Sequence, residues 1–480
     1  MKTVARNAAS GVIWSAVSQA VRLGSQLIGL VVLARLLPAS DFGLIAMATI
    51  VTGLASLFRD FGTASAVIQR PSLSGPLLDS VFWFNVGVGI VLAFGVAGSA
   101  PLVARLFSEP RLVGLLLLLS TAFPLTSMGL VQQALLERAS SFRPVALIEG
   151  SAALFGLVAA LVGARVGWGA YSLVAQSIMS AAVSTLGFWS VSAWRPRSRG
   201  SLREIRDLWW FSSNLVGFNI FNYFARTADN MLVGKFLGAT ELGYYTMAYR
   251  LMLWPLQNIS SVVGRALLPV FSKMQEDHRR LGAAYIRATA AVTLLAAPLM
   301  LGLFVLRDIF VEVALGSRWR PVSNLLAWLA PIGLLQSVGT TIGTLYISLG
   351  RTDTMLRWGV FASTSAVIAF WVGIHWGLMG LVIGYAMISC VLFIPSLAIP
   401  YRLVGLRVSA VLRSLAPFLL IGIIMAGGIM FIQRAFLVQW MGERERLLLL
   451  VVIGILIYGG LVLIYQKNLL VDIYKTMRSK

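Results

Sequence analysis

Charged side chains are scarce in this sequence. They make up 12% of the 480 residues, whereas 58% of the residues are hydrophobic and the mean hydropathy is +0.84. Soluble globular proteins carry about a quarter charged residues. The scarcity therefore excludes an ordinary soluble protein. Apolar runs of the roughly 17–25 residues that a bilayer core requires recur along the chain, so the sequence predicts an all-α polytopic membrane protein.

Cysteine, histidine and nucleotide-binding motifs are also nearly absent. Cys390 is the single cysteine, which excludes a disulfide framework within the chain. The two histidines, His278 and His375, fall in different predicted loops and suggest no metal site. No GxxxxGK[ST] motif occurs, so the chain lacks a Walker A site for ATP. We therefore expect no cofactor.

Basic residues exceed acidic ones, and the formal net charge is +21. In a membrane protein this excess favours positive-inside topology and an anionic lipid or ligand over nucleic acid. With the N-terminus in the cytoplasm, the predicted inner loops hold roughly twice as many Lys and Arg residues as the outer loops. About 14 spans then place both termini in the cytoplasm.

An internal repeat divides the chain. LLPASDFG, Leu36 to Gly43, resembles FLGATELG, Phe236 to Gly243, and a Trp-Gly pair at Trp168 recurs at Trp376 with nearly the same spacing. Both copies enter from the same side, which predicts a parallel duplication. The predicted domains are a first lobe at 1–193, a basic linker at 194–208, a second lobe at 209–400 and two added helices at 401–480.

Polar side chains recur at helical spacing on the first, seventh and eighth predicted spans. Ionisable residues cost about 3 kcal/mol each inside a membrane and persist where they face protein or a water-filled cavity. These stripes predict the wall of a hydrophilic central cavity; interhelical bonds without a ligand are the alternative. The predicted cavity residues are Arg22, Gln26, Asn219, Asn222, Arg226, Arg250, Trp254, Gln257 and Arg265.

Carboxylates inside the predicted spans are few. Asp60 and Asp229 lie well inside them, and each has an arginine near it in sequence, Arg59 and Arg226. We expect Arg59 and Asp60 to form a structural pair or a gate. Asp229 is predicted to be neutralised by an ion pair, with proton coupling as the alternative.

Two stretches carry a family resemblance. ARLLPASDFGLIAMATIVTGLASLFRDFGTASAVIQRP, from Ala34, and DNMLVGKFLGATELGYYTMAYRLMLWPLQNISSVVGRALLPVFSKMQ, from Asp229, resemble the signatures of Wzx-type polysaccharide flippases. The similarity is greatest to the colanic-acid exporter branch of the multidrug/oligosaccharidyl-lipid/polysaccharide exporter superfamily. The resemblance implies two six-helix lobes forming a V, plus two C-terminal helices.

The resemblance also implies a function in the bacterial cytoplasmic membrane. It is the flipping of undecaprenyl-pyrophosphate-linked oligosaccharide from the inner to the outer leaflet by alternating access. Arginines can bind phosphate bidentately, and Tyr223, Tyr249 and Trp254 could stack on sugar faces. Expected partners are this lipid-linked glycan, membrane lipid and polysaccharide polymerase or export proteins.

Three other functions stay open at this point. An ion-coupled drug exporter of the same superfamily often has a carboxylate in the first helix of a lobe, and the first span here has none. Lipid II flippases carry an Arg-Asp pair in the first span, whereas Arg59-Asp60 lies in the second. A membrane-embedded glycan transferase or ligase would need a large polar loop or a carboxylate cluster, and the predicted outer loops are short.

Overall fold

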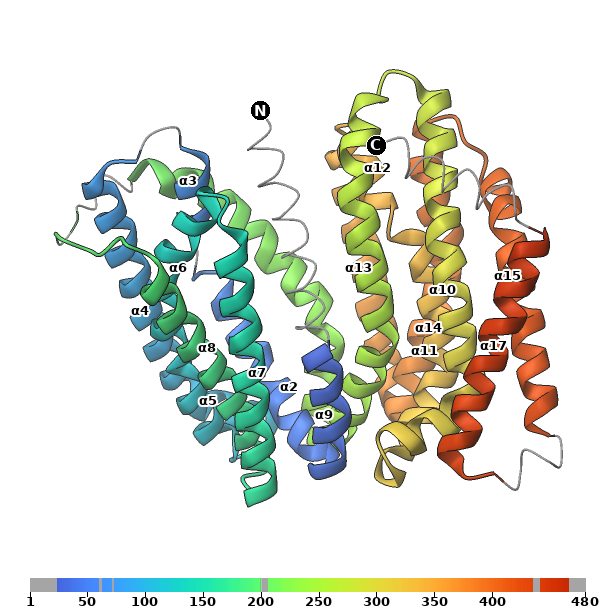
Figure 1. Ribbon diagram of the computed structural model, residues 1–480, viewed down its shortest axis with the longest axis horizontal. Helices are drawn as coiled ribbons and strands as arrows, with labels where there is room; N and C mark the ends of the chain where they lie inside the picture. The colour runs from blue at the N-terminus through green and yellow to red at the C-terminus, as the bar shows by residue number, and fades with distance from the viewer. Residues whose placement is uncertain are drawn as a thin grey trace. The chain divides into compact units, whose positions relative to one another are not determined.

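The computed structural model describes residues 24–59, 63–70, 73–198, 200, 206–434 and 441–465. They are helical throughout, with short turns between helices and no strand (Figure 1). The chain divides into two compact units, and the boundary lies between Gly243 and Tyr244. The lobe and linker boundaries expected from the repeat stay a prediction.

Unit 1 begins with a short helix over Gly24–Leu36. Its other helices are α2 (Ala39–Ser56), α3 (Thr63–Gln69), α4 (Gly75–Phe107), α5 (Leu112–Ser120), α6 (Ala122–Arg138), α7 (Phe142–Val166), α8 (Tyr171–Val191) and the first part of α9 (Arg206–Lys273). Within this unit α4 packs on α5 and α6, and α8 packs on α6 and α7 (Figure 1).

Unit 2 continues α9 and adds two 3₁₀ turns, η2 (Ser317–Trp319) and η3 (Ile374–Trp376). Its helices are α10 (His278–Ala314), α11 (Arg320–Gly339), α12 (Ile342–Ser348), α13 (Thr352–Gly373), α14 (Gly377–Leu403), α15 (Val408–Gln433) and α17 (Glu443–Tyr465). α10 packs on α11, α15 and α17, and α13 packs on α14.

Ten ranges of the described chain are long and apolar enough to cross a membrane. One of them, Thr352–Leu403, contains both α13 and α14. The prediction of an all-α polytopic membrane protein is therefore confirmed. The total of about 14 spans stays a prediction.

α9 changes direction at a glycine in the second copy of the repeat. Gly238 has φ 85° and ψ −177°, a conformation that side-chain-bearing residues rarely adopt. The sequence predicts a break at Gly238 to Gly243, and the structure places it at Gly238. The break divides α9 into two helical segments.

The two copies of the repeat pack against each other in unit 1. An added Cβ on Gly43 of α2 would lie 1.7 Å from the carbonyl oxygen of Ala239, and one on Gly243 would lie 1.9 Å from that of Ala39. The equivalent residues of each copy therefore make reciprocal contacts. Glycine is required at both positions because a side chain would overlap a backbone carbonyl.

The chain that follows α8 is held on the first turns of α4. The Asp79 carboxylate accepts hydrogen bonds from the backbone N–H groups of Arg197 and Ser198, at 3.1 and 2.9 Å, and from the Ser198 hydroxyl at 2.8 Å. The Trp83 indole donates to the Ser198 carbonyl at 2.9 Å. The start of the predicted basic linker is thus fixed to the helix bundle of unit 1.

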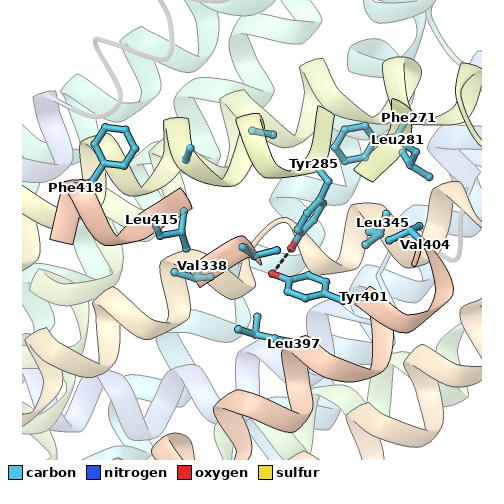
Figure 2. Close-up of a cluster of buried hydrophobic side chains, with 13 residues drawn as sticks. Phe271, Leu281, Tyr285, Val338, Leu345, Leu397, Tyr401, Val404, Leu415 and Phe418 are labelled. Carbon is cyan, nitrogen blue, oxygen red and sulfur yellow. Dashed lines mark hydrogen bonds between the residues drawn. The ribbon is translucent and has the colours of Figure 1, made fainter. Parts of the chain in front are cut away.

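Unit 2 has a buried aromatic core that includes a hydroxyl network (Figure 2). The hydroxyls of Tyr285 in α10 and Tyr401 in α14 lie 3.4 Å apart, and Thr341 donates to Tyr285 at 3.2 Å. Leu345, Leu397 and other apolar side chains surround the rings. A buried tyrosine hydroxyl needs a hydrogen-bond partner, so this network fixes how α10 and α14 align.

Candidate functional site

Unit 1 exposes part of the predicted polar stripe. Asn222 and Arg226 of α9 and Gln26 of the first described helix are exposed, Asn219 is partly buried and Asp229 is buried. In the described ranges no ion pair joins Arg226 to Asp229, whose carboxylate accepts from the backbone N–H of Asn230 at 2.7 Å. The Arg226 guanidinium is therefore accessible. Arg22 lies outside the described residues.

Unit 2 carries the polar stripe of the eighth predicted span, in the second part of α9. Arg250 and Gln257 of α9 are exposed, and Trp254 is partly buried. The indole N–H of Trp254 is buried and has no hydrogen-bond partner among the described residues. The Asn258 amide donates to the Trp254 carbonyl at 2.7 Å. The side chain of Arg265 lies outside the described residues.

Two aromatic residues that were predicted to stack on sugars have protein contacts. The Tyr223 hydroxyl of α9 donates to the carbonyls of Thr49 and Ile50 in α2, at 3.2 and 2.7 Å, and Gly53 leaves room for it. Tyr249 stacks on Tyr245 with ring centroids 5.7 Å apart. Tyr223 thus joins two helices of unit 1, and its role in sugar binding stays a prediction.

Arg59 lies at the end of α2, next to the polar interior of unit 1. One guanidinium nitrogen donates to the Thr126 hydroxyl of α6 at 3.5 Å, and its Nε is buried without a partner in the described ranges. Nearby in sequence, Thr63 donates to Asn85 at 3.0 Å. Asp60 lies outside the described residues, so its predicted pairing with Arg59 stays a prediction.

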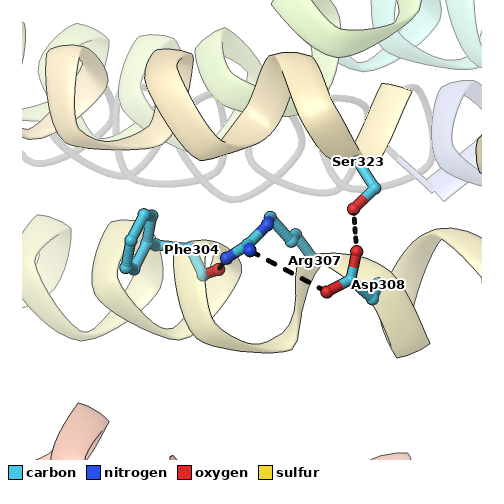
Figure 3. Close-up of polar contacts among 4 residues, drawn as sticks. All are labelled: Phe304, Arg307, Asp308 and Ser323. Carbon is cyan, nitrogen blue, oxygen red and sulfur yellow. Dashed lines mark hydrogen bonds and ion pairs between the residues drawn. The ribbon is translucent and has the colours of Figure 1, made fainter. Parts of the chain in front are cut away.

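A polar cavity of about 590 Å³ lies at one end of unit 2. Its polar walls come from α10, α11, the end of α15 and the start of α17, and they include Asp308, Glu312, Arg320, Asn324, Glu443 and Arg446. Figure 3 shows that the Asp308 carboxylate lies against the Ser323 hydroxyl and points toward Arg307. Its distance from the Arg307 guanidinium is 3.9 Å. Sequence reasoning missed this cavity, because its residues come from the ends of two helix pairs that are far apart in sequence.

Comparison with solved structures identifies the fold. Residues covering 96% of the chain match the whole of a solved structure of the lipid II flippase MurJ in an inward closed conformation, with 16% identity and a TM-score of 0.76. An inward-facing MATE-family multidrug transporter of the MOP superfamily matches over 82% of the chain and 96% of its own, with 16% identity and a TM-score of 0.61. The chain therefore has the helical fold of this transporter superfamily.

Sequence comparison identifies the family. The family described as "Polysaccharide biosynthesis protein" matches residues 32–324, and the chain belongs to this family. The lipopolysaccharide biosynthesis protein WzxC of Escherichia coli K12 is 30% identical over 80% of the chain and 78% of its own length. The succinoglycan biosynthesis transport protein ExoT of Rhizobium meliloti 1021 is 32% identical over 76% of the chain and 74% of its own length.

A third relative spans the full length. The teichuronic acid biosynthesis protein TuaB of Bacillus subtilis 168 is 26% identical over 100% of the chain and 98% of its own length. These findings confirm the predicted resemblance to polysaccharide flippases. ExoT is named as a transport protein, and the matching structures are of a flippase and a transporter.

Proposed function

We propose that this protein is a flippase that moves undecaprenyl-pyrophosphate-linked oligosaccharide from the inner to the outer leaflet of the bacterial cytoplasmic membrane by alternating access. The family membership and the transporter fold support the class of activity. The single observation that carries the choice of substrate is that Arg226 and Arg250 are exposed cations inside the long helix α9, which the sequence predicts to cross the membrane as two spans. Cations in such helices favour an anionic cargo over a cationic drug.

The chemistry of the cargo suits these residues. A pyrophosphate leaving water needs charge-assisted hydrogen bonds, which a planar guanidinium can supply in pairs. We propose that Arg226 and Arg250 bind the pyrophosphate, with Arg22 and Arg265 as secondary sites. Gln26, Asn219, Asn222, Trp254 and Gln257 are proposed contacts for the glycan. The hydrocarbon tail needs no polar site and stays in lipid.

The test is polysaccharide export in a strain that lacks its own copy of the gene. We expect Arg226→Ala and Arg250→Ala each to reduce export while the protein inserts normally. A lost hydrogen bond to a charged group costs about 1.5–3 kcal/mol, which is roughly a tenfold to hundredfold loss of affinity. Lysine at either position should rescue in part, because it keeps the charge and loses the planar fork.

Matched controls are available in both units. Arg105 in α4 and Arg357 in α13 are exposed arginines outside the predicted stripes, so their alanine variants should export normally. Arg226→Ala combined with Asp229→Ala separates cargo binding from charge neutralisation. Near-normal export by that double variant would show that Arg226 serves only to neutralise Asp229.

A further inference from the structure

The polar cavity of unit 2 lies where four helices end or begin. Val305 and Ile309 of α10 give it an apolar floor, and polar groups of α11, α15 and α17 complete the wall. Its volume of about 590 Å³ lies within the range of small-molecule sites, which is about 300–1,000 Å³. The cavity is therefore large enough for a sugar-sized ligand.

Several charged side chains of the cavity already have partners of opposite charge. The Arg320 guanidinium pairs with the Glu312 carboxylate at 2.9 Å. The Asp308 carboxylate accepts from Ser323 and pairs with Arg307. With these partners, the cavity offers neither a surplus of cations for phosphate nor a set of free carboxylates for a metal ion. In the described ranges no cluster of His, Cys, Asp and Glu could hold a metal.

Other groups in the wall are available to a ligand. The Nε–H of Arg446 is buried and has no hydrogen-bond partner in the described part of the chain, while another nitrogen of the same side chain donates to the Gln433 carbonyl at 3.2 Å. Glu443 is an exposed acceptor, and Asn324 supplies both a donor and an acceptor. Each sugar hydroxyl both donates and accepts, so this mixture suits a polyhydroxylated ligand.

We propose that this cavity binds a saccharide, with Arg446 and Asn324 donating to its hydroxyls and Glu443 accepting from them. The proposal rests on the proposed flippase function and adds a glycan subsite separate from the pyrophosphate-binding arginines. In the predicted topology this end of unit 2 faces the outside. The subsite would then hold the sugar head group after translocation.

The test measures binding of a soluble glycan to the full chain in lipid nanodiscs by calorimetry. The probe is the oligosaccharide repeat unit released by mild acid from the polysaccharide that the source strain exports. Arg446→Gln and Asn324→Leu each remove ligand bonds and nearly preserve volume. Each should weaken binding about tenfold, the change expected from losing one hydrogen bond to a charged or well-oriented group.

The matched control is Arg444→Gln, because Arg444 is exposed on the same helix and does not line the cavity. It should bind like the parent protein. If Arg446→Gln does not fold, Asn324→Leu decides the result. Absence of glycan binding by the parent protein, or unchanged binding by the folded cavity variants, would overturn the subsite. Export by the parent protein in the deletion strain is scored separately, so failure of the flippase function is distinguishable from failure of the subsite.

Discussion

The reciprocal contact between the repeat copies gives a sharp stability prediction. Replacing Gly43 with alanine would place a methyl group 1.7 Å from the Ala239 carbonyl oxygen. Carbon atoms normally pack at about 3.5–4.0 Å, so α2 and the second copy of the repeat must separate by about 1–2 Å. The obstacle is backbone, which cannot rotate away as a flexible side chain would.

The expected loss in the free energy of unfolding of Gly43→Ala follows from two opposing effects. Overpacking costs up to about 3 kcal/mol, and Gly→Ala inside a helix gains up to about 1 kcal/mol. The net loss is then about 2 kcal/mol. For a unit of this size, that corresponds to a fall in melting temperature of roughly 4–8 °C. Thermal stability of the purified chain, followed by fluorescence-detected gel filtration, measures this shift.

Gly95 in α4 is the matched control. An added Cβ there meets nothing within 4 Å, so Gly95→Ala should leave the melting temperature unchanged or raise it. Gly243→Ala should resemble Gly43→Ala, because its Cβ would lie 1.9 Å from the Ala39 carbonyl. The double variant should lose less than the sum of the two, since the first substitution already separates the segments. Equal stability of Gly43→Ala and Gly95→Ala would refute the reasoning.

Three further predictions concern topology, Arg59 and the linker. Reporter fusions at Gly200 and Glu443 should report opposite sides of the membrane, and the same side for both would contradict the topology. Reversing the charges of Arg59 and Asp60 together should restore more export than either single reversal, and no recovery would argue against pairing. Asp79→Ala should release the segment at Arg197 and Ser198, because three hydrogen bonds to the carboxylate are lost. Limited proteolysis should then cut it faster than in Ser99→Ala, whose hydroxyl bonds within its own helix.

Helices and the repeat could be predicted from the sequence for simple physical reasons. Long apolar runs have few alternatives to membrane helices, and Gly238 marks the break because its backbone conformation suits glycine. The contact between Gly43 and Ala239 was not predicted. Sequence similarity shows that two segments adopt similar structures, but not that they touch.

The two candidate sites also differ in how far the sequence alone predicts them. The accessible cations Arg226 and Arg250 follow from helical spacing, which a single segment determines. The cavity of unit 2 depends on four helix ends, and α10 lies more than 120 residues before α17 in sequence. When either sequence segment is considered alone, its carboxylates and arginines give no indication of a cavity. Tertiary packing brings Glu312 to Arg320 and places Arg446 in the same wall.

The distribution of ion pairs distinguishes two uses of arginine in this chain. Among the described residues, four of the arginines in ion pairs lie at or near helix ends, Arg111, Arg280, Arg320 and Arg351, and the fifth, Arg307, lies two turns before the end of α10. Arg226 and Arg250 lie inside α9 and belong to none of these pairs. An unneutralised cation inside a membrane helix costs about 3 kcal/mol at insertion, so a purely structural role would favour a carboxylate partner or an apolar substitute. Under the proposed function, water and an anionic cargo would offset that cost when they reach Arg226 and Arg250.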